Sequence, residues 1–156
     1  MKYLLLENIR SAYNVGAIFR TADATAVEKI FLVGHTPTPI DRFGRTQPEI
    51  KKTSLGASEY IPWQHFETVS ELLTTVKQQG VQIVAVEQSE TSVLISDYSE
   101  PRQVLYVLGN EVEGVSKEVL DSADTILELP MLGTKESLNV SVTAGVVLYY
   151  GIITKK

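Results

Sequence analysis

The sequence predicts an α/β fold, with a mostly parallel twisted sheet and helices on both of its faces. Short aliphatic runs, each ended by a polar residue, Gly or Pro, recur along the chain. Such runs are typical of strands that are buried on both faces of a parallel sheet. Helix-like segments alternate with them, as expected of βα units. With 156 residues, 44% of them hydrophobic, residues 1–156 are expected to form a single domain with one substantial core.

The first elements alternate from the start of the chain. The apolar run 4–6 and the run 29–33 are expected to be strands, and the segment 15–25 between them a helix. The stretch 35–52 contains three prolines, which favour an irregular segment. A further strand is expected at 58–62.

The second half continues the alternation. Strands are expected at 82–86, 104–108 and 125–129, because each is a run of aliphatic and β-branched residues. Helices are expected at 68–79, at 116–122, where Ser116 is a suitable N-cap, and at 139–154.

The helix after the first strand has two distinct faces. Its apolar stripe consists of Val15, Ile18, Phe19, Ala22 and Ala26. Gly16, Arg20 and Asp23 fall on the opposite face. Without a side chain at Gly16, another backbone or a ligand could come close, and the Arg20 guanidinium suits phosphate or carboxylate. The alternative is a surface ion pair between Arg20 and Asp23.

The irregular stretch carries the only basic cluster of a chain whose net charge is −5. The cluster comprises Arg42, Arg45, Lys51 and Lys52. It is either a solvated loop or a surface that faces RNA or phosphate. The net charge itself argues against tight non-specific binding of nucleic acid.

A loop with two glycines, Gly109 and Gly114, follows the strand at 104–108. It lacks the glycine and lysine pattern of a phosphate-binding loop, and Glu111 and Glu113 would repel phosphate. The loop therefore favours a neutral or cationic ligand. Because it shares an edge of the sheet with the loops after the first and last strands, one site built from all three is expected.

The helix at 139–154 contains no charged residue. One apolar stripe holds Val140, Ala144, Val147 and Gly151, and the other holds Val142, Val146, Tyr149 and Ile153. Such a helix must be buried on more than one side, most simply against the core and against a second copy of the chain. Membrane insertion is the alternative, but the run is shorter than the ~20 residues of a span. The preceding loop at 130–139 either binds a polar ligand or supplies Ser137 or Asn139 as an N-cap.

Composition excludes several classes of protein and site. The chain has no cysteine, which excludes disulfides and thiol catalysis, and its two histidines stand alone, so no metal is expected. The start of the chain does not resemble a secretory leader, and a cytoplasmic protein without membrane contact is expected.

Four stretches now point to a family. NVGAIFRTAD (14–23), LGNEVEG (108–114) and LPMLGTKESLNVSV (129–142) resemble the three signature motifs of the SpoU (TrmH-like) family of RNA ribose 2′-O-methyltransferases, in the SPOUT superfamily. KTSLGAS (52–58) is also similar to this family. The resemblance implies a C-terminal deep trefoil knot, an exception among folds, S-adenosylmethionine bound there, a homodimer with its active site near the interface, and tRNA or rRNA as substrate.

The resemblance also implies site residues. The catalytic positions are Asn14, Arg20, Glu111, Ser137 and Asn139. The methyl donor is expected on Val86, Glu87, Gly109, Asn110, Leu129, Met131, Ser137 and Leu138. RNA binding is expected at Arg10, Arg42, Arg45, Lys51 and Lys52. Nothing in the sequence selects the RNA or the nucleotide.

A ribose 2′-hydroxyl must lose its proton as it attacks the donor methyl. Because an arginine effectively never deprotonates, we prefer a role in which Arg20 holds the neighbouring phosphate and orients the hydroxyl, with a free-base arginine as the alternative. The rival function is a catalytically silent module with the same fold that binds RNA or nucleotides. The presence of all five catalytic positions favours the enzyme.

Overall fold

The computed structural model describes residues 1–154, in which seven parallel strands form one sheet of order β3-β2-β1-β6-β4-β7-β5. The strands are β1 (Lys2–Glu7), β2 (Lys29–Val33), β3 (Trp63–Phe66), β4 (Gln82–Val86), β5 (Val93–Leu94), β6 (Val104–Leu108) and β7 (Thr125–Glu128). The parallel α/β sheet expected from the sequence is confirmed, with β2, β4 and β6 at the predicted residues.

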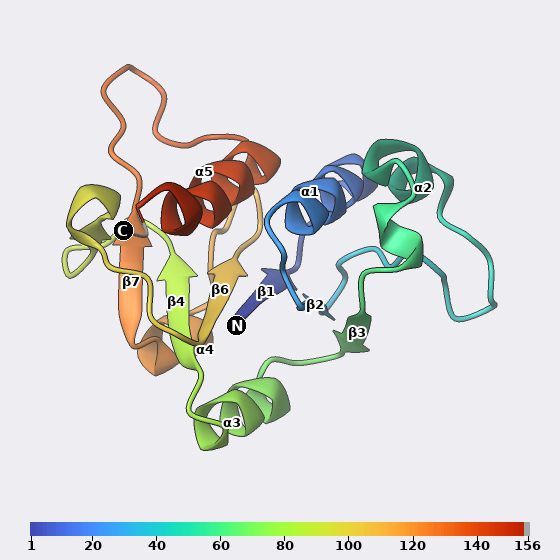
Figure 1. Ribbon diagram of the computed structural model, residues 1–156, viewed down its shortest axis with the longest axis horizontal. Helices are drawn as coiled ribbons and strands as arrows, with labels where there is room; N and C mark the ends of the chain where they lie inside the picture. Colours follow the sequence, from blue (N-terminus) through green and yellow to red (C-terminus); the bar gives the residue numbers. More distant parts are fainter. Residues whose placement is uncertain (155–156) are drawn as a thin grey trace.

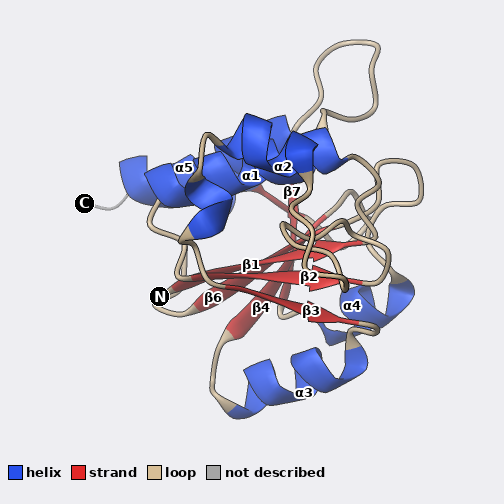
Figure 2. Cartoon of the chain, turned by 90° about the vertical axis from the view of Figure 1, so that its right-hand side faces the viewer, coloured by secondary structure: helices blue, strands red, loops and turns tan. Residues whose placement is uncertain are grey.

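Helices cover both faces of this sheet. They are α1 (Ala12–Ala24), α2 (Pro48–Ser54), α3 (Ser70–Gln78), α4 (Lys117–Ser122) and α5 (Val140–Ile153). Figure 1 and Figure 2 show α1, α2 and α5 on one face and α3 and α4 on the other. Within residues 1–154, no helix is both long and apolar enough to cross a membrane.

Two sequence-based expectations, for the stretches 58–62 and 35–52, were wrong. The segment 58–62 is not a strand: Ala57–Glu59 form a 3-10 turn, and β3 begins at Trp63. The left-handed conformations of Leu55 (φ 49°) and Gly56 (φ 89°) end α2 and turn the chain away from an extended path. The stretch 35–52 is also not irregular throughout, because Pro48 opens α2, where a proline at the first turn costs no hydrogen bond.

The core lies in two layers, one on each face of the sheet. On β1, Leu4 and Leu6 pack under α1 and α5, whereas Leu5 packs toward α3 and α4. All three side chains are at most 1% exposed. This alternation follows from the two-residue period of a strand, and it explains why the run is apolar throughout.

A buried polar cluster fixes α5 on the sheet. The Lys2 ammonium donates to the carbonyl of Leu148 at 3.0 Å and lies 3.3 Å from the Glu100 carboxylate. The Tyr106 hydroxyl donates to Glu100 at 2.9 Å. Burial raises the pKa of Tyr106, and it raises that of the adjacent Tyr98 to about 12, so both hydroxyls keep their protons at neutral pH. Because Lys2 bonds the α5 backbone, this cluster sets the position of the helix as well as its burial.

Candidate functional site

A cavity of about 640 Å³ opens at the carboxyl ends of β4, β6 and β7. Its walls are the three segments that follow these strands. All eight residues expected to hold a methyl donor line it: Val86, Glu87, Gly109, Asn110, Leu129, Met131, Ser137 and Leu138. Three of the expected catalytic residues, Glu111, Ser137 and Asn139, line it as well. The tertiary structure thus brings together positions more than 50 residues apart in the chain.

The segment 108–114 is shaped by a close approach of backbone to backbone. A Cβ on Gly109 would lie 2.3 Å from the carbonyl carbon of Gly114 and from the amide nitrogen of Val115. Asn110 and Gly114 exchange backbone hydrogen bonds of 3.1 and 2.9 Å. The Asn110 side chain donates to the carbonyl of Asn8 at 2.8 Å. This wall of the cavity is therefore rigid before any ligand arrives.

Glutamates fasten the wall to its neighbours. Glu111 accepts from the amide of Arg10 at 3.1 Å and from that of Ser11 at 3.3 Å, which joins the cavity to the start of α1. Glu87 accepts from Val115 at 3.1 Å, and Glu7 accepts from Ser116 at 2.9 Å. Glu111 is thus a positioning group in this structure, because its carboxylate is engaged by backbone amides.

Sequence reasoning overlooked two of the residues that build this cavity. Glu7 is only 4% exposed, although it is charged. A charged residue at the end of an apolar strand could have been recognised from the sequence as a candidate site residue. Gln88 follows β4 at the cavity edge, where its amide donates to the carbonyl of Glu136 at 2.6 Å and holds the loop before α5.

The lining favours a ligand with positive charge. Apolar side chains such as Val86, Leu127 and Leu129 form one part of the wall. The ionisable groups among the described lining residues are all glutamates, namely Glu87, Glu111, Glu113 and Glu136. Carboxylates at this density attract a cation and repel a phosphate, as expected from the sequence of this loop.

Asn139 is the N-cap of α5. Its side-chain oxygen accepts from the amide of Ser141 at 2.8 Å and from the Ser141 hydroxyl at 2.6 Å. Of the two candidate caps, Asn139 and not Ser137 is the one used. Capping and ligand contact are compatible here, since Asn139 also lines the cavity.

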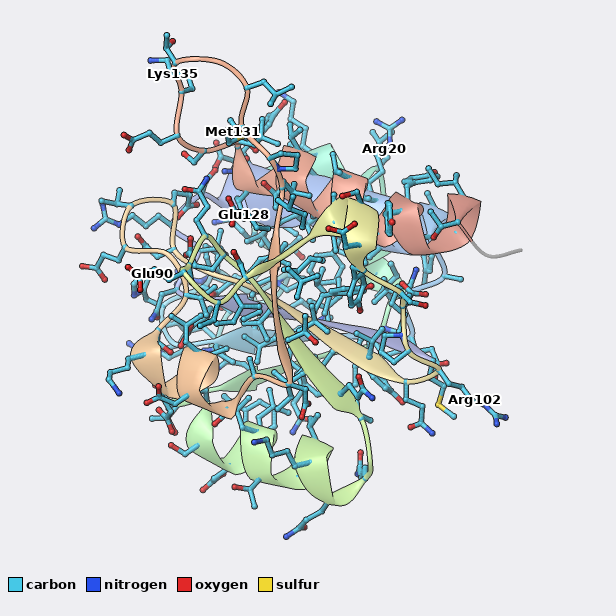
Figure 3. The ribbon with its side chains drawn as sticks, turned by 90° about the vertical axis from the view of Figure 1, so that its left-hand side faces the viewer. Arg20, Glu90, Arg102, Glu128, Met131 and Lys135 are labelled. Atoms are coloured by element: carbon cyan, nitrogen blue, oxygen red, sulfur yellow. The ribbon has the colours of Figure 1, made fainter. Side chains whose placement is uncertain are left out.

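Arg20 lies outside this cavity. It is exposed on α1, and Figure 3 shows it pointing into solvent, apart from Met131 of the lining. Among residues 1–154 it makes no ion pair, so the alternative of an Arg20–Asp23 pair is not realised. Asp23 instead accepts a hydrogen bond from the Tyr60 hydroxyl, and this bond raises the pKa of Tyr60. Asn14, on the same helix, is 7% exposed and also lies outside the cavity.

Gly16 is explained by helix packing. A Cβ there would lie 1.9 Å from the Thr53 hydroxyl oxygen and 2.7 Å from the carbonyl of Ile50. The Thr53 hydroxyl bonds the carbonyl of Tyr13 at 3.1 Å. The groups that approach Gly16 thus come from α2, namely the Thr53 hydroxyl and the Ile50 backbone, and this packing secures the helix that carries Arg20.

The residues expected to bind RNA are all exposed, and they occupy two places. Arg10 lies beside the cavity, because its backbone amide donates a hydrogen bond to the lining residue Glu111. The others lie toward the β2–β3 end, with Arg42 and Arg45 in the loop before α2 and Lys51 and Lys52 on α2. Arg45 pairs with Asp41 at 2.8 Å and Lys51 with Glu59 at 3.3 Å.

Substitution of Gly109 is expected to damage the cavity. Because a Cβ there meets backbone atoms, Gly109→Ala should separate the two sides of the wall and cost about 1–3 kcal/mol of stability. Denaturant unfolding measures this loss. Gly133→Ala is the matched control, since nothing lies within 4 Å of a Cβ at that position. Equal stability of the two variants would contradict this account of the wall.

The fold and the site together define a class: a parallel α/β protein with an acidic, preformed ligand cavity at the carboxyl edge of its sheet. In the part of the chain that the structure describes, no group of three His, Cys, Asp or Glu side chains is arranged to hold a metal ion. A profile of the SpoU rRNA Methylase family matches residues 1–149. The chain belongs to this family.

Individual relatives agree with this assignment. The chain is 32% identical over 145 residues to the 23S rRNA (guanosine-2′-O-)-methyltransferase RlmB of Neisseria meningitidis serogroup B, covering 93% of this chain and 55% of that protein. It is 30% identical over 144 residues to the tRNA (guanosine(18)-2′-O)-methyltransferase of Escherichia coli K12, covering 92% and 59%. The chain therefore spans little more than half the length of these curated relatives.

A solved structure shows the same arrangement. The AdoMet-bound rRNA methyltransferase from Sinorhizobium meliloti superimposes with a TM-score of 0.84 at 28% identity, over 96% of this chain and 55% of that one. Seven strands and the helices on both faces thus form a fold that also occurs in a structure with the bound methyl donor.

Proposed function

We propose that residues 1–156 act as one catalytic domain that transfers a methyl group from S-adenosylmethionine to a ribose 2′-hydroxyl of tRNA or rRNA in the cytoplasm. The observation that carries this proposal is the cavity at the ends of β4, β6 and β7, which gathers every residue that the family resemblance assigned to the donor. The activities by which both relatives are named support the choice of RNA as the substrate.

The lining fits S-adenosylmethionine. Its sulfonium and ammonium groups are cationic, and Glu87, Glu111, Glu113 and Glu136 surround the cavity. Apolar side chains such as Leu127 and Leu129 suit the adenine, and the rigid backbone of the segment 108–114 suits main-chain hydrogen bonds to it. When bound, the donor supplies a methyl group that is already activated by the sulfonium, so no metal is required.

We propose that the chain works as a homodimer, with the trefoil knot of the SPOUT fold in its C-terminal part. On α5, Val142, Val146, Tyr149 and Ile153 are 50%, 42%, 44% and 75% exposed. The opposite stripe, which includes Ala144 and Val147, is buried against the core. A helix with both stripes apolar and only one covered supports a second copy as the partner.

The dimer also gives Arg20 a place in the reaction. Arg20 does not line the cavity of its own chain, but α1 packs beside α5, so an interface on α5 would bring Arg20 near the partner's cavity. There its guanidinium would bind the phosphate next to the target ribose and orient the 2′-hydroxyl toward a proton acceptor. Asn14, on the same helix, would position the same nucleotide. Glu111, Ser137 and Asn139 would shape the donor side.

Two measurements test the proposal. Titration calorimetry of the purified protein should show S-adenosylmethionine binding in the presence of a chelator and without RNA, because the whole lining belongs to one chain. Nucleoside mass spectrometry of RNA from cells with and without the gene should then reveal one missing 2′-O-methylated nucleotide. Donor binding without any change in the RNA would favour the silent module.

A further inference from the structure

A second recess lies at the other end of the same sheet edge. It is lined by the loop after β2, by the start of α2 and by Trp63 and His65 of β3, and its volume is about 1110 Å³. Arg42, Phe43 and Arg45 are exposed lining residues in the loop between β2 and α2, and we call the turn 40–46 that carries them the rim. We refer to this recess, bounded by residues 35–48 and β3, as the hairpin groove.

The rim of the hairpin groove is held rigid. Ile40 and Thr46 form an antiparallel bridge. The Asp41 carboxylate accepts from the amides of Phe43 and Arg45 at 2.8 and 2.9 Å and from the Arg45 guanidinium at 2.8 Å. These bonds, led by that of the Arg45 amide, lower the pKa of Asp41, so the carboxylate stays charged at neutral pH. These bonds and the Ile40–Thr46 bridge fix the backbone on both sides of Phe43.

The tip of this turn carries an exposed aromatic side chain between two arginines. Phe43 is 67% exposed, and its ring lies 4.8 Å from the guanidinium carbon of Arg42 and 5.0 Å from that of Arg45. Exposure of a large aromatic ring is unfavourable, and nothing in the core requires this one. Planar guanidinium groups and aromatic rings are the surfaces on which unpaired bases stack.

One cation of the groove has no carboxylate partner. Asp41, Glu67, Arg42 and Arg45 all line the groove, and the Asp41 carboxylate pairs with Arg45. Arg42, by contrast, has no carboxylate partner among the described residues and is free to bind a phosphate at the rim. The arrangement suits a nucleotide whose phosphate binds Arg42 while its base stacks at Phe43.

The sheet topology aligns this groove with the donor cavity. Because the strands are parallel, the loops after β2, β1, β6 and β4 share one edge. The groove lies at β2 and β3, Arg10 follows β1, and the cavity lies at β6, β4 and β7. Neighbouring strands are ~4.8 Å apart, so the step from β2 to β4 is roughly 14 Å. One RNA strand along this edge could occupy both places.

We propose that the hairpin groove is a stacking subsite for an unpaired base of the RNA substrate, a few nucleotides away from the methylated ribose. This inference rests on the proposed function, because it takes RNA as the ligand. Phe43 and the two guanidinium groups supply the stacking surface, and Arg42 binds the adjoining phosphate. The subsite selects unpaired over paired RNA, since a base within a duplex cannot leave its stack without cost.

Fluorescence of a single-stranded nonaribonucleotide with a central 2-aminopurine tests the subsite directly. Binding to the wild-type protein should quench the probe. Phe43→Ala should reduce affinity about tenfold, the usual loss for one stacked base, and abolish the quenching. Phe43→Trp should retain both, and Phe43→Leu should behave like Phe43→Ala. A probe that the wild type does not bind, or that Phe43→Ala binds and quenches equally, would overturn the inference.

The same variants keep this inference distinct from the proposed function. Phe43→Leu retains an apolar side chain without a π-face, so full activity of this variant would overturn the stacking role. S-adenosylmethionine affinity should be unchanged in every Phe43 variant, because Phe43 does not line the donor cavity. If Phe43→Ala binds RNA normally while methyl transfer persists, the subsite fails and the methyltransferase stands.

Discussion

Arg20→Ala is expected to lower methyl transfer at least ~100-fold while leaving the fold and the donor site intact, the scale of losing one preorganised group from an active site. Arg20 is exposed and makes no ion pair within residues 1–154, so its loss should change stability by no more than ~0.5 kcal/mol. Arg20→Lys should not restore the rate, because an ammonium cannot reproduce the guanidinium fork. Single-turnover rates on the identified RNA, beside calorimetry with S-adenosylmethionine, measure both effects.

Mixing two inactive variants extends this test to the dimer. If Arg20 acts on the partner's cavity, an equimolar mixture of Arg20→Ala and a donor-site variant such as Gly109→Val should regain about a quarter of the wild-type rate. Half of the random dimers would then carry one complete site out of two. A mixture that stays inactive although the subunits exchange would place Arg20 in its own chain's site. Near-normal turnover by Arg20→Ala alone would remove Arg20 from the mechanism.

Tyr149→Glu is expected to dissociate the dimer and, with it, to abolish most of the activity. Tyr149 is 44% exposed in the outer stripe of α5, and a carboxylate buried there without a partner costs several kcal/mol, which corresponds to at least ~100-fold in the dissociation constant. Val146→Lys should act in the same way. Sedimentation velocity at micromolar concentration measures the association, and circular dichroism checks that the helices persist.

Thr74→Lys, on the exposed face of α3 across the sheet, is the matched control for an added charge. It should remain dimeric and active. A wild-type protein that sediments as a stable monomer would contradict the interface on α5. A monomeric Tyr149→Glu variant with full activity would leave the interface in place but contradict the need for the dimer in catalysis, and it would require Arg20 to reach the cavity within one chain.

Much of the fold was predictable because its signals are local. The runs 29–33, 82–86 and 104–108 became β2, β4 and β6 without a shift, since strands buried on both faces are apolar throughout. The donor cavity was predictable for a related reason. Loops after parallel strands meet at one edge of the sheet, so the glycine-bearing segments after β6 and β7 were expected on the same edge, and the strand order places them on either side of β4.

Other elements were not predicted from local sequence patterns. Helix α2 is only seven residues long and strand β5 only two, too short for a clear periodic pattern. The three prolines in the stretch 35–52 also favoured an irregular segment where α2 begins. The expected strand at 58–62 failed because left-handed residues at 55 and 56 redirect the chain, and φ angles are not visible in an apolar pattern.

The sequence by itself determined most of the strands and the apolar α5, because each depends on composition and periodicity within a few residues. The residues of the donor cavity came from the resemblance of its motifs to a known family. Only the tertiary structure decided that Glu111 holds the amides of Arg10 and Ser11, that Gly16 makes room for α2, and that Arg20 lies outside the cavity of its own chain. The Glu111 bonds join residues about 100 positions apart. Such contacts depend on strand order and helix packing, for which no short stretch of sequence carries a signal.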